Sequence, residues 1–264
     1  MTNTRTPDEV SGGPAGSAAG RPLPRDLAAA KERGEGWAMV TAYDFLTAKV
    51  LEEAGITVLL VGDSAAGAVY GHPSSDDLTV DELVPLARAV VRGSQQAMVV
   101  ADLPHGSYES SPRQALATAG RFLAEAGVHA VKIEGGLPMT PQISALTSAG
   151  VAVMGHLDYA AEGGDHAGIR RSASALQAAG AYAIVLRGIP ARLSARITGS
   201  LRIPTVGIGS GPHCDAQVLR WQDMAGLTPH TPASGRRYAD VRSVIREAAR
   251  DFAEEVRRGT HAQG

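Results

Sequence analysis

The sequence predicts an α/β protein, a parallel (β/α)8 TIM barrel, from two observations. One pattern recurs along the chain: a helical stretch ends in Ala-Gly, an apolar run follows, and a polar or Gly-rich cluster closes the unit. The apolar runs are also continuous rather than alternating, as is typical of strands that are covered on both faces. Helices and strands that alternate with short connections require a parallel sheet.

Seven strands are expected in chain order. The first, third and seventh are Trp37–Ala42, Ala97–Leu103 and Ile203–Ile208. The other four follow Ala-Gly in LEEAG-ITVLLV-GDS, LAEAG-VHAVKI-EGG, LTSAG-VAVM-GHLD and LQAAG-AYAIVL-RGI, which begin at Leu51, Leu123, Leu146 and Leu176. A short eighth strand is expected near Asp223–Leu227. Glycine ends a helix because it adopts the left-handed conformation without a Cβ penalty.

Seven or eight strand–helix units and the missing nucleotide motif favour a closed barrel. Thr79 and Ser111 are expected to cap helices, the second before Pro112. An open doubly wound sheet is the alternative, but no GxGxxG follows the first strand. We expect residues 24–264 to form a single barrel domain, with a disordered tail, rich in Gly, Pro, Ser, Ala and Thr, at residues 1–23.

The segment Tyr238–Arg258 is predicted to be an amphipathic terminal helix that serves packing or subunit contact. Its apolar residues fall at helical spacing: Val241, Val244, Ile245, Ala248, Phe252 and Val256.

Charge and composition give no reason to expect nucleic acid or membrane binding. The formal net charge of the 264 residues is -2, and no apolar run approaches the roughly 20 residues that cross a bilayer. Cys214 is the only cysteine, so a cytoplasmic, reducing setting is expected.

Charged side chains follow several of the predicted strands. In a barrel of this type the active site lies at the carboxyl ends of the strands. Those ends carry Asp63, Ser64, Asp102, Lys132, Glu134, His156 and Arg187. Burial of such charges without partners is costly, so we expect them to serve one another, a metal or a ligand.

Each candidate has a functional and a structural interpretation. Asp63 and Asp102 are hard oxygen donors suited to Mg²⁺, or each caps the helix that follows. Lys132 and Glu134 alternate on one strand and face the same side; they bind a substrate carboxylate and a metal-bound water, or form a structural ion pair. His156 is a site residue or a core histidine.

With these residues the chain resembles the ketopantoate hydroxymethyltransferase family, as a divergent member, among the phosphoenolpyruvate mutase/isocitrate lyase-like barrels. The resemblance covers roughly Met39 to Leu227. It rests on TAYD (Thr41–Asp44), LVGDS (Leu60–Ser64), ADLP (Ala101–Pro104), VKIEGG (Val131–Gly136), GHL (Gly155–Leu157) and IPTVGIGSG (Ile203–Gly211).

The resemblance implies a Mg²⁺-assisted class II aldol reaction on a small 2-oxo acid, 3-methyl-2-oxobutanoate. The one-carbon unit would come from 5,10-methylenetetrahydrofolate, and the product would be 2-dehydropantoate. It implies Asp63, Asp102 and Glu134 as metal ligands and a homo-oligomer, since the family forms decamers. The expected substrate-binding residues are Ser64, Asp63, Asp102, Lys132 and His156; the expected catalytic residues are Lys132, His156 and Arg187.

Two departures from the family pattern concern proton abstraction. The family's C3 base is a glutamate where this chain has Arg187, and arginine stays protonated at neutral pH. The loop between His156 and Gly180 is also shorter than the family's Gly-rich loop.

Three interpretations stay open. The first is a specialised hydroxymethyltransferase or aldolase whose base is Glu162, Asp165 or His166. The second is a C–C lyase for a dicarboxylic 2-oxo acid, in which Arg187 clamps the extra carboxylate. The third is a catalytically silent paralogue. A loop carboxylate at the metal pocket favours the first interpretation. Arg187 inside an unfilled pocket favours the second, and pairing of Arg187 with Glu134 or Asp102 favours the third.

Overall fold

The computed structural model describes residues 20–229 and 236–260. The chain divides into two compact units, Met1–Val218 and Leu219–Gly264, which are treated separately. Most of the tail predicted at residues 1–23 lies outside the described residues, and residues 20–23 form neither helix nor strand. The prediction of one domain over residues 24–264 stays a prediction.

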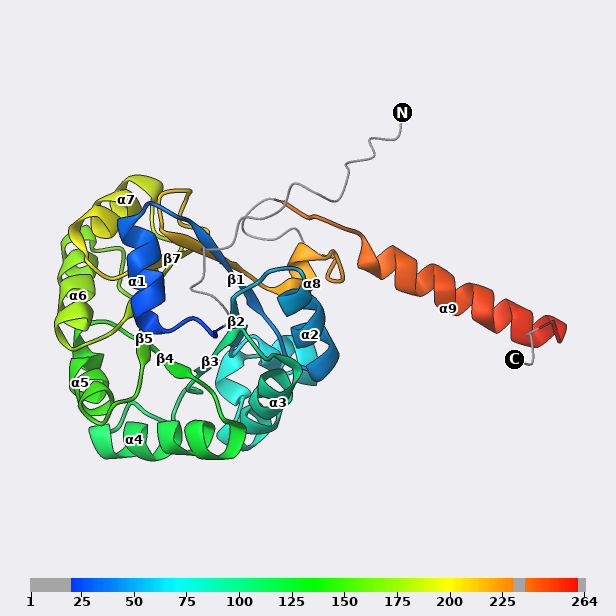
Figure 1. Cartoon of the computed structure of the whole chain (residues 1–264), viewed down its shortest axis with the longest axis horizontal. Helices are drawn as coiled ribbons and strands as arrows, with labels where there is room; N and C mark the ends of the chain where they lie inside the picture. The colour runs from blue at the N-terminus through cyan, green and yellow to red at the C-terminus, as the bar shows by residue number, and fades with distance from the viewer. Residues whose placement is uncertain (1–19, 230–235, 261–264) are drawn as a thin grey trace. The chain divides into compact units, whose positions relative to one another are not determined.

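Eight parallel strands close into a barrel in the order β1 to β8, which confirms the predicted fold class (Figure 1). The strands are β1 Trp37–Thr41, β2 Val58–Val61, β3 Met98–Asp102, β4 Ala130–Glu134, β5 Val153–Asp158, β6 Ala183–Arg187, β7 Thr205–Ile208 and β8 Ala216–Leu219.

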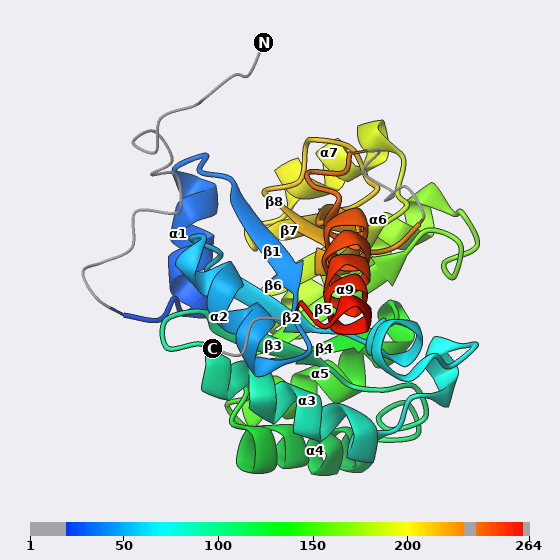
Figure 2. The same cartoon turned by 90° about the vertical axis from the view of Figure 1, so that its right-hand side faces the viewer.

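Helices surround the barrel, and α2, α3 and α4 follow one another along its outside (Figure 2). The long helices of this unit are α1 Pro24–Glu32, α2 Phe45–Glu53, α3 Val80–Gly93, α4 Pro112–Arg121, α5 Thr140–Ser148, α6 His166–Ala178 and α7 Ala191–Ser200. Single turns are η1 Ala66–Tyr70, η2 Ser75–Asp77, η3 Phe122–Ala126 and η4 Leu137–Met139.

The helix boundaries follow the predicted signals. The hydroxyls of Thr79 and Ser111 accept N–H groups in the first turns of α3 and α4, as predicted. The glycine of each Ala-Gly pair has a left-handed backbone, with φ between 76° and 97°. These four are Gly55, Gly127, Gly150 and Gly180. Helix ends and strand starts are therefore set locally.

The predicted position of the eighth strand is wrong. The strand is β8 at Ala216–Leu219, whereas Asp223 belongs to the short helix α8, Trp221–Met224. β8 is only four residues long, and Gln217 within it is exposed, so composition does not distinguish it. It is defined by its pairing with β7, in which Val206 is level with Ala216.

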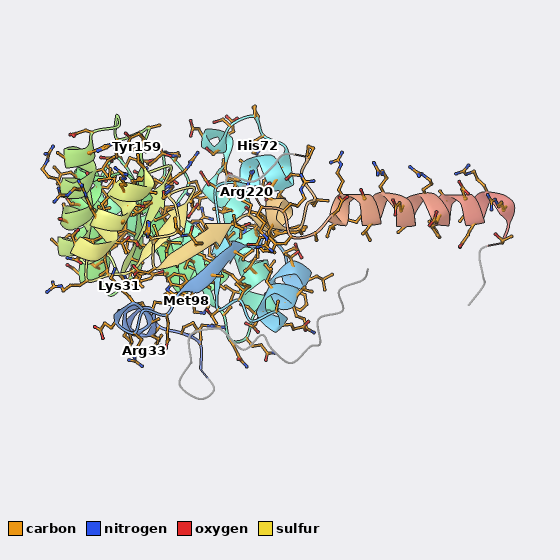
Figure 3. The ribbon with its side chains drawn as sticks, turned by 90° about the horizontal axis from the view of Figure 1, so that it is seen from above. Lys31, Arg33, His72, Met98, Tyr159 and Arg220 are labelled. Atoms are coloured by element: carbon orange, nitrogen blue, oxygen red, sulfur yellow. The ribbon has the colours of Figure 1, made fainter. Side chains whose placement is uncertain are left out.

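The barrel interior is apolar at one end and charged at the other. Leu27 and Ala30 of α1 pack with inward-facing residues of the strands in one buried cluster, so α1 covers the amino-terminal end. Figure 3 shows His72 and Tyr159, from the loops after β2 and β5, on the side opposite Lys31 of α1. The carboxyl ends of the strands are therefore left for a site.

The second unit contains α8 and α9, Val241–Arg258, which lies within the segment predicted to be helical. Asp240 caps α9 by accepting the N–H of Ser243. The unit does not bury the apolar stripe of α9, because Val244 and Phe252 are 65% and 56% exposed. Across the described residues, no helix is both long and apolar enough to cross a membrane.

Candidate active site

The alternation of side chains along β4 places two charged groups at the barrel mouth. Ala130 belongs to the apolar cluster inside the barrel. Because side chains two residues apart share a face of a strand, Lys132 and Glu134 also point inward, one level higher each. Their Nζ and Oε1 atoms are 3.1 Å apart. The predicted shared orientation of these two residues is what the structure shows.

Lys132 is the charged centre of the mouth. Its side chain is 3% exposed, and its ammonium lies 3.0 Å from Oδ1 of Asp102 and 3.1 Å from Oε1 of Glu134. Burial works against the charged ammonium, but the surrounding carboxylates outweigh it and raise the pKa of Lys132 above its ordinary value. Lys132 is therefore a fixed positive charge.

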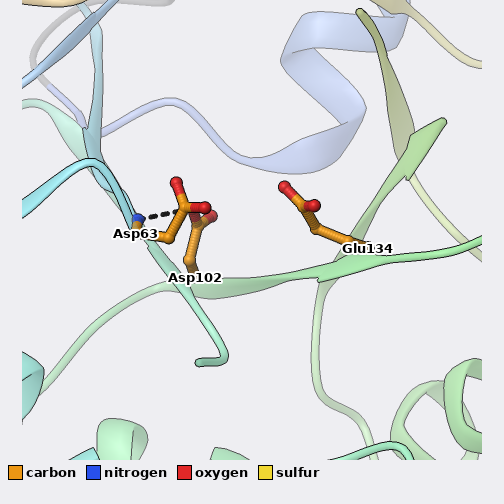
Figure 4. A group of neighbouring side chains, drawn as sticks. All are labelled: Asp63, Asp102 and Glu134. Atoms are coloured by element: carbon orange, nitrogen blue, oxygen red, sulfur yellow. Dashed lines mark hydrogen bonds between the residues drawn. The ribbon is translucent and has the colours of Figure 1, made fainter. Parts of the chain in front are cut away.

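Asp63, Asp102 and Glu134 form a carboxylate cluster (Figure 4). One oxygen from each lies within 4.8 Å of the others. The backbone N–H of Asp63 donates to Oδ2 of Asp102 at 2.9 Å, which holds the β2 and β3 ends together. Neither aspartate caps the next helix, because Ser111 caps α4 and η1 has no side-chain cap.

The chemistry of this cluster fits a divalent metal. Three hard oxygen donors converge from the turn after β2 and from the ends of β3 and β4, and such ligands suit cations of this kind. Burial raises the pKa of Asp102 above its ordinary value, so the site disfavours an isolated anion there. The pKa of Glu134 is held well below its ordinary value: burial opposes this, but Lys132 and His156 outweigh it. A bound cation would compensate the charge that burial disfavours at Asp102.

His156, on β5, completes the charged mouth. Its Nδ1 contacts Oε1 of Glu134 and lies 3.1 Å from Nζ of Lys132. Its Nε2 is buried and has no hydrogen-bond partner among the residues that the structure describes. Burial lowers the pKa of His156, and the charges of Lys132 and Arg187 lower it further. A buried, unpartnered ring nitrogen at a mouth indicates a place for a ligand rather than a satisfied core histidine.

Ser64 comes directly after Asp63 in the turn that follows β2. Its hydroxyl shares a hydrogen bond of 2.6 Å with the hydroxyl of Tyr43. Tyr43 is buried and is the second residue after β1. The pair therefore fixes one polar group of the predicted substrate-binding set between the ends of β1 and β2.

Arg187 does not enter the carboxylate cluster. It ends β6 level with Asp158 of β5, and its Nε lies 3.1 Å from Oδ2 of Asp158. Its side chain is 54% exposed. Arg187 thus pairs with its strand neighbour, and neither of the ion pairs that would indicate a closed mouth, with Glu134 or Asp102, is formed.

The loop after β5 brings one of its three candidate bases to the site. Asp165 caps α6 and pairs with Arg171, with its side chain 56% exposed. The exposed His166 bonds to the hydroxyl of Tyr159 at 3.1 Å. Glu162, in contrast, lines a pocket together with Glu134 and His156.

This pocket measures about 320 Å³ and opens beside the carboxylate cluster. It is lined by His105, Tyr108, Glu109, Glu134, Gly135, Gly136, Pro138, Met139, His156, Asp158, Ala161 and Glu162. Asp158 is a pocket residue that was not predicted, although it continues the inward series of Met154 and His156 at two-residue spacing. The same spacing that identified Lys132 and Glu134 identifies it.

Comparison with known proteins shows the family of this chain. The family model for ketopantoate hydroxymethyltransferase matches residues 23–263. The 3-methyl-2-oxobutanoate hydroxymethyltransferase of Frankia alni is 56% identical over 251 residues, which are 90% of this chain and 83% of the relative. The enzyme of the same name from Acidothermus cellulolyticus is 53% identical, over 89% of this chain and 92% of the relative.

Solved structures share the barrel. The phosphoenolpyruvate phosphomutase of Streptomyces platensis subsp. rosaceus aligns with a TM-score of 0.65 at 20% identity, over 91% of this chain and 92% of that one. A phosphonopyruvate hydrolase also aligns at 0.65, with 18% identity over 89% and 87% of the two chains. These similarities show the fold, whereas the family model and the relatives cover nearly the whole chain at much higher identity. The chain therefore belongs to the ketopantoate hydroxymethyltransferase family.

Proposed function

We propose that the protein is a Mg²⁺-dependent hydroxymethyltransferase that converts 3-methyl-2-oxobutanoate and 5,10-methylenetetrahydrofolate to 2-dehydropantoate. The observation that carries this proposal is the convergence of three carboxylates beside Lys132 and His156 at one barrel mouth. More than half of the residues are shared with relatives named for this reaction.

Asp63, Asp102 and Glu134 are the residues that would hold Mg²⁺, a cation that prefers oxygen ligands. When bound, Mg²⁺ supplies Lewis acidity that polarises the keto group of a 2-oxo acid and favours loss of its C3 proton. The ion pairs of Lys132 keep Asp102 and Glu134 oriented toward the cluster.

The remaining mouth residues suit recognition of the oxo acid. Lys132 presents a fixed positive charge to a carboxylate, and the unpartnered Nε2 of His156 offers a hydrogen bond. Ser64 offers a hydroxyl from the β2 side. Arg187 stands at the edge as a second fixed cation, and its assignment as catalytic stays a prediction.

The arrangement supports the hydroxymethyltransferase over the other two interpretations. Arg187 inside the pocket would favour a clamp for a second substrate carboxylate, but its guanidinium is paired with Asp158 and its side chain is half exposed. Pairing of Arg187 with Glu134 or Asp102 would favour a silent paralogue, but Arg187 pairs with Asp158 instead. Glu162, a loop carboxylate in the pocket beside Glu134, favours the hydroxymethyltransferase interpretation.

A homo-oligomer is also expected, with the apolar stripe of α9 as a contact surface. Light scattering on the purified protein measures the assembly directly. Replacement of Phe252 by aspartate should reduce the assembly mass if the stripe is a subunit contact, and an unchanged mass would remove α9 from the interface.

The function is tested by product formation. Purified protein is incubated with Mg²⁺, 3-methyl-2-oxobutanoate and 5,10-methylenetetrahydrofolate, and 2-dehydropantoate is followed by NMR. We expect product that disappears with EDTA and returns with Mg²⁺. Parallel reactions use a dicarboxylic 2-oxo acid. Turnover of that acid alone would replace the proposal with the arginine-clamp lyase, and no turnover of either would overturn it.

A further inference from the structure

We propose that Glu162 is the general base that removes the C3 proton of the 2-oxo acid, an inference that rests on the proposed function. The reaction needs a proton acceptor beside the carboxylate cluster. Glu162 reaches the pocket from the loop between β5 and α6, and it shares that pocket with Glu134 and His156.

The other carboxylates of the pocket are committed to strong partners. Glu134 pairs with Lys132 and contacts His156. Asp158 accepts the N–H groups of Ala160 and Ala161 at 2.8 and 3.0 Å through Oδ1, while Oδ2 pairs with Arg187.

Glu109 is committed in the same way. It accepts the N–H groups of Gly106 and Tyr108, both at 3.1 Å, and contacts His105. A carboxylate that already accepts several hydrogen bonds, or is paired with a cation, is a poor proton acceptor because protonation would break those contacts.

Glu162 is held more lightly. Among the described residues, its side chain accepts one hydrogen bond, from the Ser172 hydroxyl to Oε2 at 3.1 Å. The Ser172 hydroxyl in turn accepts the N–H of Leu137 at 3.2 Å. Oε1 therefore stays available, and a neutral hydroxyl fixes the carboxylate without neutralising its charge.

Gly136 makes room for this carboxylate two residues beyond Glu134. A Cβ at position 136 would overlap Oε1 of Glu162 and Oγ of Ser172. The absence of a side chain there lets Glu162 lie over the end of β4. The structure thus provides both an anchor and a space for one carboxylate at the mouth.

The proton-transfer step is balanced within the site. Glu162 takes the C3 proton, the electron pair of the C3–H bond forms a C2–C3 double bond, and the C2=O electrons move to the keto oxygen. In D₂O the reverse step delivers a deuteron to C3. This exchange needs no one-carbon donor, so it isolates the base.

The test measures loss of the C3 proton signal of 3-methyl-2-oxobutanoate by NMR in D₂O with Mg²⁺. We expect Glu162→Gln to slow exchange by about 100-fold or more, as removal of a general base typically does. Asp165→Asn, a change in the same loop, should keep the rate. Calorimetry should show that Glu162→Gln still binds Mg²⁺ and the oxo acid with the affinity of the unchanged protein.

Chemical rescue separates catalysis from structure. Formate or acetate added to Glu162→Ala should restore part of the exchange, because a small carboxylate can occupy the vacated space. Exchange that survives Glu162→Gln overturns the inference and leaves the proposed function intact. Loss of exchange together with loss of oxo-acid affinity, without rescue, also overturns it. An unchanged protein that gives neither exchange nor product refutes the proposed function itself.

Discussion

Two sides of the barrel mouth are built differently. On the β2–β4 side, Asp102, Lys132 and Glu134 lie on strands and satisfy one another through ion pairs of about 3 Å. On the β5–β6 side, Asp158 pairs with Arg187, and a further pocket carboxylate, Glu162, comes from the loop after β5. On the first side the charged residues pair with one another on fixed strand positions. On the second side a loop contributes one of the carboxylates.

The difference explains how a family member can have Arg187 at the edge of its site and still present a base. The pleat fixes the direction of each side chain on a strand. If a cluster carboxylate on a strand is substituted, no neighbouring residue can take its place. A loop can deliver a carboxylate from another position, as Glu162 is delivered through Ser172. Loss of one base is therefore more easily compensated than loss of one ligand.

The largest effect is expected from Lys132→Met measured in EDTA. This change leaves Asp102 and Glu134 without their common cation, and breaking a buried ion pair costs about 3–5 kcal/mol. Urea unfolding should show a loss of that size in the free energy of unfolding, and Mg²⁺ should recover part of it. The exposed Lys49→Met is the control. A loss no larger than that of the control would mean that the β2–β4 side is not a coupled set.

Asp102→Asn should have the next largest effect, on the metal. Loss of a partner outside the coordination sphere typically costs about 10–100-fold in metal affinity or activity, so loss of a ligand should weaken Mg²⁺ binding and C3 exchange by about 100-fold or more. Calorimetry and NMR measure the two quantities. Asp76→Asn, on the exposed turn η2, should change neither. Retained Mg²⁺ affinity would remove Asp102 from the metal site.

Gly136→Ala tests the position of Glu162, because it fills the space that Gly136 leaves for this carboxylate. The added Cβ should displace Glu162, and a misplaced group can cost up to about 100-fold in rate; we expect C3 exchange to fall about tenfold while Mg²⁺ affinity is kept. Gly120→Ala, where a Cβ meets no atom within 4 Å, is the matched control. Equal rates for the two variants would argue against the position of Glu162.

Arg187→Gln should have the smallest effect. Its ion pair with Asp158 is half exposed, and such pairs contribute about 1 kcal/mol or less. Urea unfolding should show a change within that limit, comparable to that of Arg171→Gln, which removes another exposed pair. A loss of oxo-acid affinity in Arg187→Gln alone would instead assign the guanidinium to substrate binding.

The site residues that lie on strands could mostly be predicted from the sequence, because helix-end signals and side-chain alternation depend only on nearby residues. Ala-Gly signals located the strand starts, and two-residue spacing put Lys132 and Glu134 on one face. Asp158 obeys the same spacing and was overlooked, since its segment reads as the start of a loop. The strand β8 could not be located in this way, because four residues carry too little pattern.

The sequence by itself determined the barrel, seven of its strands, the caps Thr79 and Ser111, and most of the charges at the strand ends. Only the tertiary structure decided which charges meet: that Lys132 lies between Asp102 and Glu134, that Arg187 turns to Asp158, and that Glu162 alone of three loop candidates lines the pocket. Local rules fix the direction of a side chain on a strand, whereas the path of a loop depends on contacts between residues distant in sequence, here Glu162 with Ser172 and Gly136.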